Sequence, residues 1–120
     1  MRNLKNILLS LIIAFSTSSF SEVAEVYQWK AFPGKSMEMM ESMLKAAEIH
    51  EKQGAKVAID VHNVGSTQLV NYVLRWDDSK SYAASKDIQA SSDEWVEFWA
   101  EANQNPSGEM MASFSANNLD

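Results

Sequence analysis

The stretch that decides the fold is Gln-Leu-Val-Asn-Tyr-Val-Leu-Arg-Trp, residues 68–76. Side chains alternate between the two faces of an extended chain, so one face of this stretch is wholly apolar and the other mixes apolar with polar residues. The apolar face carries Val70, Tyr72, Leu74 and Trp76. Such a strand suits the centre of a sheet that has helices packed on one side and a wetter surface on the other.

Strand and helix patterns alternate on both sides of this stretch. Alternating apolar residues predict further strands over 23–32, 55–64 and 109–116. Helical spacing predicts one helix over 36–53, a helical stretch over 77–89, and a short helix after residue 91 that breaks at 103–108. The order is therefore strand, helix, strand, strand, helix, strand.

Turn and cap residues mark the ends of these elements. The expected helix N-caps are Ser36, Asp77 and Ser91, the last in capping-box spacing with Glu94. Gly54 is the expected end of the first helix, and the pair at 65–66, Gly-Ser, is the expected turn between the second and third strands.

This order of elements predicts an α+β, ferredoxin-like βαββαβ fold. In that fold the first and third strands lie in the middle of a four-stranded antiparallel sheet, with the two main helices on one face. We expect the bare face of the sheet to carry its more polar residues, namely Gln28, Lys30, Asp60, His62, Asn71, Arg75, Ser113 and Ser115. Its apolar members are expected to be Val26, Phe32, Leu69, Val73 and Met111. A half-apolar face needs covering, so we expect two copies to pair there as a homodimer.

The first 21 residues have the pattern of a secretory signal peptide. Arg2 and Lys5 precede an apolar run over 7–15 that is too short to span a bilayer, and small residues follow. Cleavage after Ser21 would leave one domain over 22–120, in the periplasm or secreted. An uncleaved N-terminal anchor is the alternative.

The composition narrows the range of partners. Without Arg2 and Lys5 the chain keeps 8 basic residues against 16 acidic ones, a net charge of −8. This charge repels phosphate backbones and anionic lipids, so we expect no nucleic-acid partner, and no membrane partner after signal cleavage. The chain has no cysteine, which excludes disulfides and thiolate metal sites. We predict no metal and no cofactor.

Short motifs also connect the chain to a family. They are Phe32-Pro33-Gly34-Lys35, Val64-Gly65-Ser66, Arg75-Trp76 and Ser92-Asp93-Glu94-Trp95-Val96-Glu97-Phe98-Trp99. Together they resemble the dimeric α/β-barrel superfamily, closest to its NIPSNAP-like and antibiotic-biosynthesis-monooxygenase-like (ABM-like) members. The resemblance implies that two sheets form a barrel in the dimer. It also implies a pocket between sheet and helices, which in the superfamily binds quinones, polyketides, haem or no known ligand.

The haem-degrading branch of that superfamily is matched only in part. Trp76 matches its tryptophan at the end of the third strand, and Gln28 stands loosely where the branch has an asparagine. Near Ser85, where the branch has its iron-binding histidine, this chain has none. The resemblance therefore argues against haem, and it implies that any oxygenase activity is cofactor-independent.

Polar residues on the sheet supply a candidate catalytic site. His62 and Asp60 share one strand face, and Arg75 is expected opposite them. A carboxylate beside an imidazole raises its pKa into a range useful for acid-base chemistry. The alternative is a polar pair inside the dimer barrel. The candidate ligand-binding residues are Gln28, Asn71, Trp76, Trp95 and Trp99. For His50, we expect a favourable interaction with the dipole at the end of its helix.

We predict an exported homodimeric barrel that binds a small, partly apolar molecule, with or without monooxygenase-like or isomerase-like activity. One alternative is a non-catalytic interaction or stress-related module. Another is a methionine-rich, copper-binding periplasmic protein, because residues 37–43 with Met110 and Met111 offer soft thioether ligands for Cu(I). Core packing explains the same methionine spacing.

Overall fold

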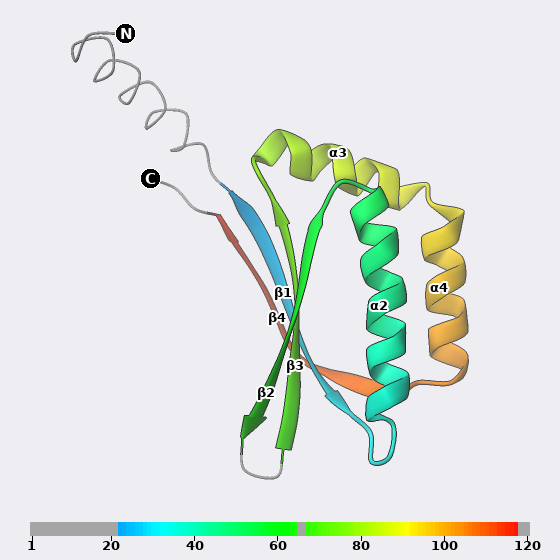
Figure 1. Cartoon of the computed structure of the whole chain (residues 1–120). Helices are drawn as coiled ribbons and strands as arrows, with labels where there is room; N and C mark the ends of the chain where they lie inside the picture. The colour runs from blue at the N-terminus through cyan, green and yellow to red at the C-terminus, as the bar shows by residue number, and fades with distance from the viewer. Residues whose placement is uncertain (1–21, 65–66, 118–120) are drawn as a thin grey trace, which may run out of the picture.

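The computed structural model describes residues 22–64 and 67–117 (Figure 1). Its strands are β1 (Val23–Ala31), β2 (Lys56–Val64), β3 (Thr67–Trp76) and β4 (Gly108–Asn117). Its helices are α2 (Ser36–Lys52), α3 (Ser79–Ala90) and α4 (Asp93–Gln104). The expected signal peptide and the expected turn at 65–66 lie outside the described residues. None of the helices in the described ranges is long and apolar enough to cross a bilayer.

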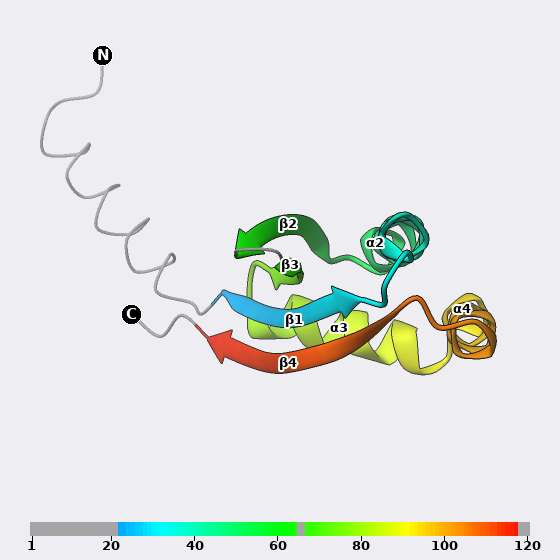
Figure 2. The same ribbon diagram turned by 90° about the horizontal axis from the view of Figure 1, so that it is seen from below.

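The four strands form one antiparallel sheet in the order β2-β3-β1-β4. This order, with β1 and β3 in the middle, confirms the ferredoxin-like prediction. Helices α2 and α4 run side by side over one face of the sheet, and α3 crosses near the end where β3 stops (Figures 1 and 2). Three helices are described where two main ones were expected, because the connection from β3 to β4 contains both α3 and α4.

The core lies between the apolar face of β3 and helix α2. Val70 and Leu74 are only 1% and 2% exposed, and Met39 and Met43 of α2 belong to the same buried cluster. Burying an aliphatic side chain of this size contributes about 1.5–3 kcal/mol. The apolar face predicted for residues 68–76 is therefore the face that folds against the helices.

Helix α2 differs from the prediction at its N-terminal end only. The N-cap is Lys35 rather than Ser36, and no side chain caps the first turn. Gly54 follows the helix with a φ of +100°, a left-handed conformation that favours glycine, so the predicted stop is confirmed.

The caps of α3 and α4 each lie one residue later than predicted. Asp78, not Asp77, caps α3 and accepts a hydrogen bond from the Ser81 amide at 2.7 Å. Ser92, not Ser91, caps α4 through the Trp95 amide at 3.1 Å. Both positions occur in pairs of good capping residues, so residue type alone does not choose between neighbours.

Strand β4 faces the opposite way from prediction over most of its length. Ser113 is paired with Tyr27 and Ser115 with Glu25, both of which face the helices, so these serines are not on the bare face. Phe114, paired with Val26, lies there instead. The register shifts between residues 28 and 29 of β1. A one-residue shift moves every later side chain to the other face, and the alternation in β4 alone does not reveal it.

Candidate functional site: a cavity between sheet and helices

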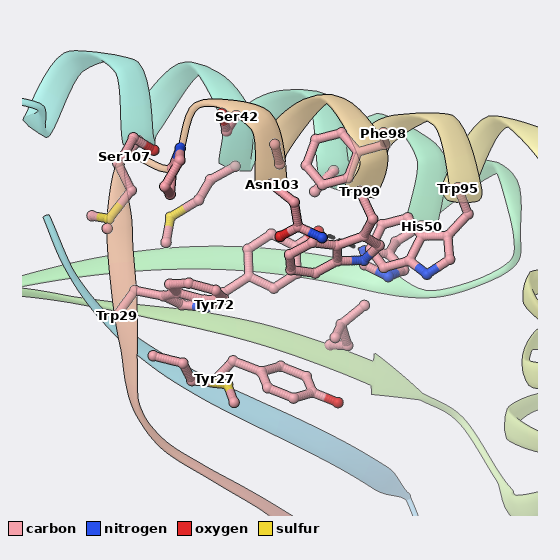
Figure 3. Close-up of a pocket in the computed structure, with 18 of the residues that line it drawn as sticks. Tyr27, Trp29, Ser42, His50, Tyr72, Trp95, Phe98, Trp99, Asn103 and Ser107 are labelled. Atoms are coloured by element: carbon pink, nitrogen blue, oxygen red, sulfur yellow. Dashed lines mark hydrogen bonds between the residues drawn. The ribbon is translucent and has the colours of Figure 1, made fainter.

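A cavity of about 350 Å³ lies between the sheet and the helices (Figure 3). Strands β1 and β3 form its floor, and α2 and α4 its roof. Most of its wall is aromatic or contains a thioether, with contributions from Tyr27, Trp29, Met39, Met43, Tyr72, Trp95, Phe98, Trp99 and Met110. A concave, mainly apolar site with a few polar groups is the usual form of a small-molecule site.

Helix α4 supplies most of the aromatic wall. Trp95, Phe98 and Trp99 are spaced by three and four residues and so share one side of the helix. The Trp95 and Phe98 rings are stacked with centroids 5.4 Å apart, and Trp99 meets Trp95 edge-on at 5.7 Å. Across the cavity, the Trp29 ring of β1 lies 6.4 Å from that of Trp99. These rings are only partly covered by protein, so they line the cavity rather than fill it.

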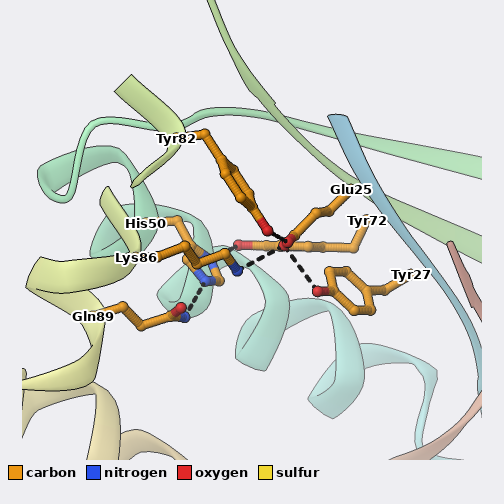
Figure 4. A network of polar contacts seen from close by, with 7 residues as sticks. All are labelled: Glu25, Tyr27, His50, Tyr72, Tyr82, Lys86 and Gln89. Atoms are coloured by element: carbon orange, nitrogen blue, oxygen red, sulfur yellow. Dashed lines mark hydrogen bonds and ion pairs between the residues drawn. The ribbon is translucent and has the colours of Figure 1, made fainter. Parts of the chain in front are cut away.

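A charged pair, Glu25 and Lys86, belongs to the lining of the cavity at its polar end, and Figure 4 shows its contacts. The Glu25 carboxylate accepts hydrogen bonds from the Tyr82 hydroxyl at 2.7 Å, the Lys86 ammonium at 2.9 Å and the Tyr27 hydroxyl at 2.9 Å. Burial alone would raise the pKa of Glu25, but the bonds from Lys86, Tyr82 and Tyr27 outweigh it and the pKa is lowered. Glu25 is therefore ionised, and its charge is compensated by Lys86.

A second, uncharged polar group adjoins this pair. His50 Nδ1 lies 2.7 Å from the Tyr72 hydroxyl, and His50 Nε2 lies 3.3 Å from the amide nitrogen of Gln89. The Trp95 ring packs on the imidazole with centroids 4.3 Å apart. Burial, with the nearby positive charge of Lys86, lowers the pKa of His50 to about 4. The imidazole is therefore neutral at pH 7, and the expected interaction of a positive His50 with the helix dipole is wrong.

Of the five predicted ligand-binding residues, two line this cavity, Trp95 and Trp99. Trp76 lies on the same face of the sheet but packs edge-on against Tyr82, with ring centroids 4.8 Å apart, outside the cavity wall. Gln28 and Asn71 lie on the bare face, where the Gln28 amide donates to the Asn71 side-chain oxygen at 3.2 Å.

The predicted catalytic residues also lie on the bare face, away from the cavity. Asp60 and His62 are exposed on β2. The expected position of Arg75 opposite them is wrong, because Arg75 is paired with Lys56 while His62 is paired with Leu69. Six residues of strand, about 20 Å, separate those two levels.

Sequence reasoning missed the polar end of the cavity. One signal was present: Glu25 interrupts the apolar alternation of β1 between Val23 and Tyr27 on the face that packs against the helices. An acidic residue on a buried face needs a partner. The partners, Tyr82 and Lys86, lie near sixty positions further along the chain, and no local pattern connects them to Glu25.

The methionine-rich segment divides between two environments. Met39 and Met43 face the cavity, as does Met110 of β4, whereas Met37 is 77% exposed. Within 22–64 and 67–117, no group of three histidine or acidic side chains could hold a metal ion. Thioethers that line a cavity from α2 and β4 are what core packing predicts, and they are what the copper alternative would have to use.

The fold and the cavity define a ferredoxin-like α+β protein with room for a small molecule between sheet and helices. No protein-family model and no curated protein matches the chain. Several solved structures, in contrast, match the fold of this chain. A NIPSNAP domain protein from Burkholderia xenovorans has a TM-score of 0.61 and 17% identity, covering 82% of this chain and 93% of that one. A NIPSNAP family protein from Agrobacterium tumefaciens has a TM-score of 0.60 and 13% identity, covering 80% and 90%.

A third similar structure is a putative antibiotic biosynthesis monooxygenase from Chloroflexus aurantiacus. Its TM-score is 0.57 at 13% identity, and the match covers 79% of this chain and 90% of that one. At such identities the likeness is one of fold. The NIPSNAP-like and ABM-like fold implied by the sequence motifs is confirmed.

Proposed function

We propose that this protein binds a small, partly apolar molecule in the cavity between sheet and helices. The observation that carries the proposal is the cavity itself, whose aromatic walls stay partly uncovered. Aromatic rings left open in this way favour a flat apolar ligand.

We further propose that the protein acts as an exported homodimer. The basic start, apolar run and small residues of positions 1–21 support export. The apolar side chains of the bare face, with Phe114 60% exposed, support pairing of two sheets. Intact mass of the exported protein should give a chain that starts at Glu22, and a chain starting at Met1 would contradict cleavage.

Catalysis is a second candidate, and the putative monooxygenase among the structural neighbours favours it. Such chemistry would place the substrate against the polar end of the same cavity, where His50 and Tyr72 lie.

The test uses N-phenylnaphthylamine, a neutral probe that fluoresces in apolar surroundings. We expect saturable binding to the full chain. Ala102 lines the cavity on α4 while Ala100 is exposed on the same helix. Ala102→Trp fills the cavity and should weaken probe binding at least tenfold. Ala100→Trp is the matched control and should leave it unchanged. Equal binding by both variants would show that the probe does not occupy this cavity.

A further inference from the structure

The cavity is elongated along helix α2. The α2 side chains that line it are Met39, Met43, Ala46 and His50, which follow one another at intervals of about one helical turn. From the first of these residues to the last, an α-helix rises about 16 Å. Figure 3 labels Ser107 at one end of the cavity and His50 at the other. A molecule that fills the cavity therefore lies along α2, with one end near His50 and the other near Met39.

The end of the cavity at His50 is closed by hydrogen-bonded groups. His50 Nδ1 lies 2.7 Å from the Tyr72 hydroxyl, and both residues line the cavity. Glu25, which also belongs to the lining, accepts hydrogen bonds from three side chains. Moving any of these groups would break hydrogen bonds of buried or partly buried atoms, which is costly. This end of the cavity is therefore fixed in position.

The opposite end is closed by a thioether that lies on a glycine. A Cβ atom at Gly108 would lie 2.6 Å from the Met39 sulfur and 2.8 Å from the Lys30 carbonyl oxygen. Gly108 does not have a positive φ, so the close approach of these neighbours, and not its backbone conformation, requires glycine here. The Met39 side chain is buried at 4% exposure and lines the cavity. Its sulfur therefore fills the space between α2 and the start of β4.

Of the two partners in this contact, only the Met39 side chain is free to move. The Phe32 amide donates to the Ser107 carbonyl oxygen at 2.9 Å, and Gly108 is paired with Ala31. These bonds fix the backbone at the start of β4 against the end of β1. The Met39 side chain is unbranched and flexible, and it has no polar hydrogen that needs a partner. Shortening it therefore lengthens the cavity without leaving a buried donor unpaired.

We propose that Met39, in contact with Gly108, sets the length of the molecule that the cavity accepts. Met39 is in this sense a specificity-determining residue. Met43 lies one turn further along α2 and borders the middle of the cavity, so it limits width instead. The inference rests on the proposed function, since it assigns the length limit of the same cavity.

Fluorescence titration of the full chain with related probes tests it. The probes are N-phenylnaphthylamine and its derivatives with a butyl or a tert-butyl group in the para position of the phenyl ring. The two substituents have the same number of carbon atoms, but butyl adds length and tert-butyl adds width. The ratio of the two affinities, butyl over tert-butyl, therefore reports selection by length at nearly constant apolar content.

Two substitutions remove the same side chain from neighbouring turns of α2. Met39→Ala opens the end of the cavity and should raise the butyl to tert-butyl ratio about tenfold. The reason is that the butyl chain reaches about two carbons further, and each buried methylene adds about a factor of four in affinity. Met43→Ala is the matched control, because it removes the same volume from the middle of the cavity. It should leave the ratio unchanged or lower it.

Gly108→Ala acts in the opposite direction. The added methyl group meets the Met39 sulfur and should push it into the cavity, so the ratio should fall. In the Met39→Ala background the methyl group has no sulfur to displace, so the same substitution should leave the ratio unchanged. The contact with the Lys30 carbonyl oxygen is present in both backgrounds and cancels in the comparison. An equal fall in both backgrounds would show that Met39 does not transmit the effect.

The possible failures are distinguishable. If wild-type protein binds none of the probes, the proposed function falls and this inference falls with it. If it binds them but Met39→Ala does not raise the ratio above that of Met43→Ala, the cavity is still a binding site and Met39 does not set its length. If Met39→Ala does not fold, Met39→Leu and Met43→Leu replace the pair. Leucine is shorter than methionine, so only Met39→Leu should raise the ratio, and the absence of a rise overturns the inference.

Discussion

At the scale of single residues, one buried imidazole connects stability to pH. His50 is only 8% exposed and touches Tyr72 and Trp95. Its ring is neutral because burial, with Lys86 nearby, lowers its pKa, and Glu25 only partly offsets that effect. The unfolded chain has no such environment, so its His50 takes up a proton at a higher pH than the folded one does.

We therefore expect stability to fall as the solution is acidified. The pKa of His50 is 6.5 in the unfolded chain and about 4 in the folded one. Above pH 6.5 His50 therefore does not lower the free energy of unfolding, and its destabilising effect grows as pH falls toward 4. The full loss is at most about 3 kcal/mol. Urea unfolding at a series of pH values measures it. His50→Gln should flatten the curve in the upper part of this range, where carboxylates stay ionised. The exposed His62 gives the control, and a His62→Gln curve as flat as that of His50→Gln would contradict the assignment.

The pair of Glu25 and Lys86 gives a second prediction at this scale. Glu25→Gln leaves the ammonium of Lys86 without its counter-charge and should cost about 1–3 kcal/mol, because Lys86 keeps partial contact with solvent. Lys86→Met in the same chain should recover part of that loss, since no unpaired charge then stays in the cavity wall. Chemical denaturation of the two single variants and the double variant measures the coupling. Strictly additive costs would show that the pair does not interact.

Among these residues, the sequence predicts the local patterns but not the contacts between distant parts of the chain. The apolar face of residues 68–76 was predictable because strand alternation is local. The aromatic wall of α4 was predictable because helical spacing is local as well. The contacts of Glu25 with Tyr82 and Lys86 depend on how α3 lies across β1, which no local pattern contains. The candidate residues on the bare face were chosen for polarity, and polarity alone does not reveal which face holds a cavity.

At the scale of elements, helix ends illustrate the same limit. Residues 91 and 92 are both serine, and only the backbone decides which one caps α4. The Ser92 hydroxyl accepts from the Trp95 amide at 3.1 Å, whereas the Ser91 hydroxyl only reaches carbonyl oxygens of α3 at 3.4 Å. The capping role therefore belongs to Ser92.

Replacing each serine by alanine separates the two positions. Ser92→Ala removes the cap of the helix that forms the cavity roof and should cost about 1 kcal/mol. Ser91→Ala should cost less than half of that. Thermal unfolding followed by circular dichroism measures both. An equal loss from the two variants would mean that the helix starts elsewhere in solution.

Strand β4 shows how one local feature changes a whole face. The irregular pairing between residues 28 and 29 turns Met110 toward the cavity and Phe114 toward the bare face. The start of the strand also lies in close contact with its neighbours. A Cβ atom at Gly108 would lie 2.6 Å from the Met39 sulfur and 2.8 Å from the Lys30 carbonyl oxygen. Such features follow from how β4 meets β1 and α2, so the order of strands was predictable but the facing of the last strand was not.

At the scale of the whole molecule, the sheet is covered on one side only. Helices α2 and α4 lie over one face, and the described part of the chain places no helix on the other (Figure 2). That other face combines polar residues such as Asn71 with apolar ones such as Phe114 and Val26. A mixed face of this kind is suited to an interface, because its apolar part favours association and its polar part favours one orientation.

The homodimer proposal is tested by placing a charge on that face. Phe114→Asp puts a carboxylate where the second sheet would pack. Burying it without a partner is costly, so the dimer should dissociate to monomers at concentrations where wild type stays dimeric. Val96, which is 63% exposed on α4, gives the matched control, and Val96→Asp should leave the dimer intact. Size-exclusion chromatography with light scattering gives the mass of each. A monomeric wild type would contradict the barrel, and dissociation by Val96→Asp instead would move the interface to the helices.

Because the cavity lies on the helix side, monomers of Phe114→Asp should still bind N-phenylnaphthylamine. Loss of that binding would show that the partner sheet helps to hold the cavity in shape.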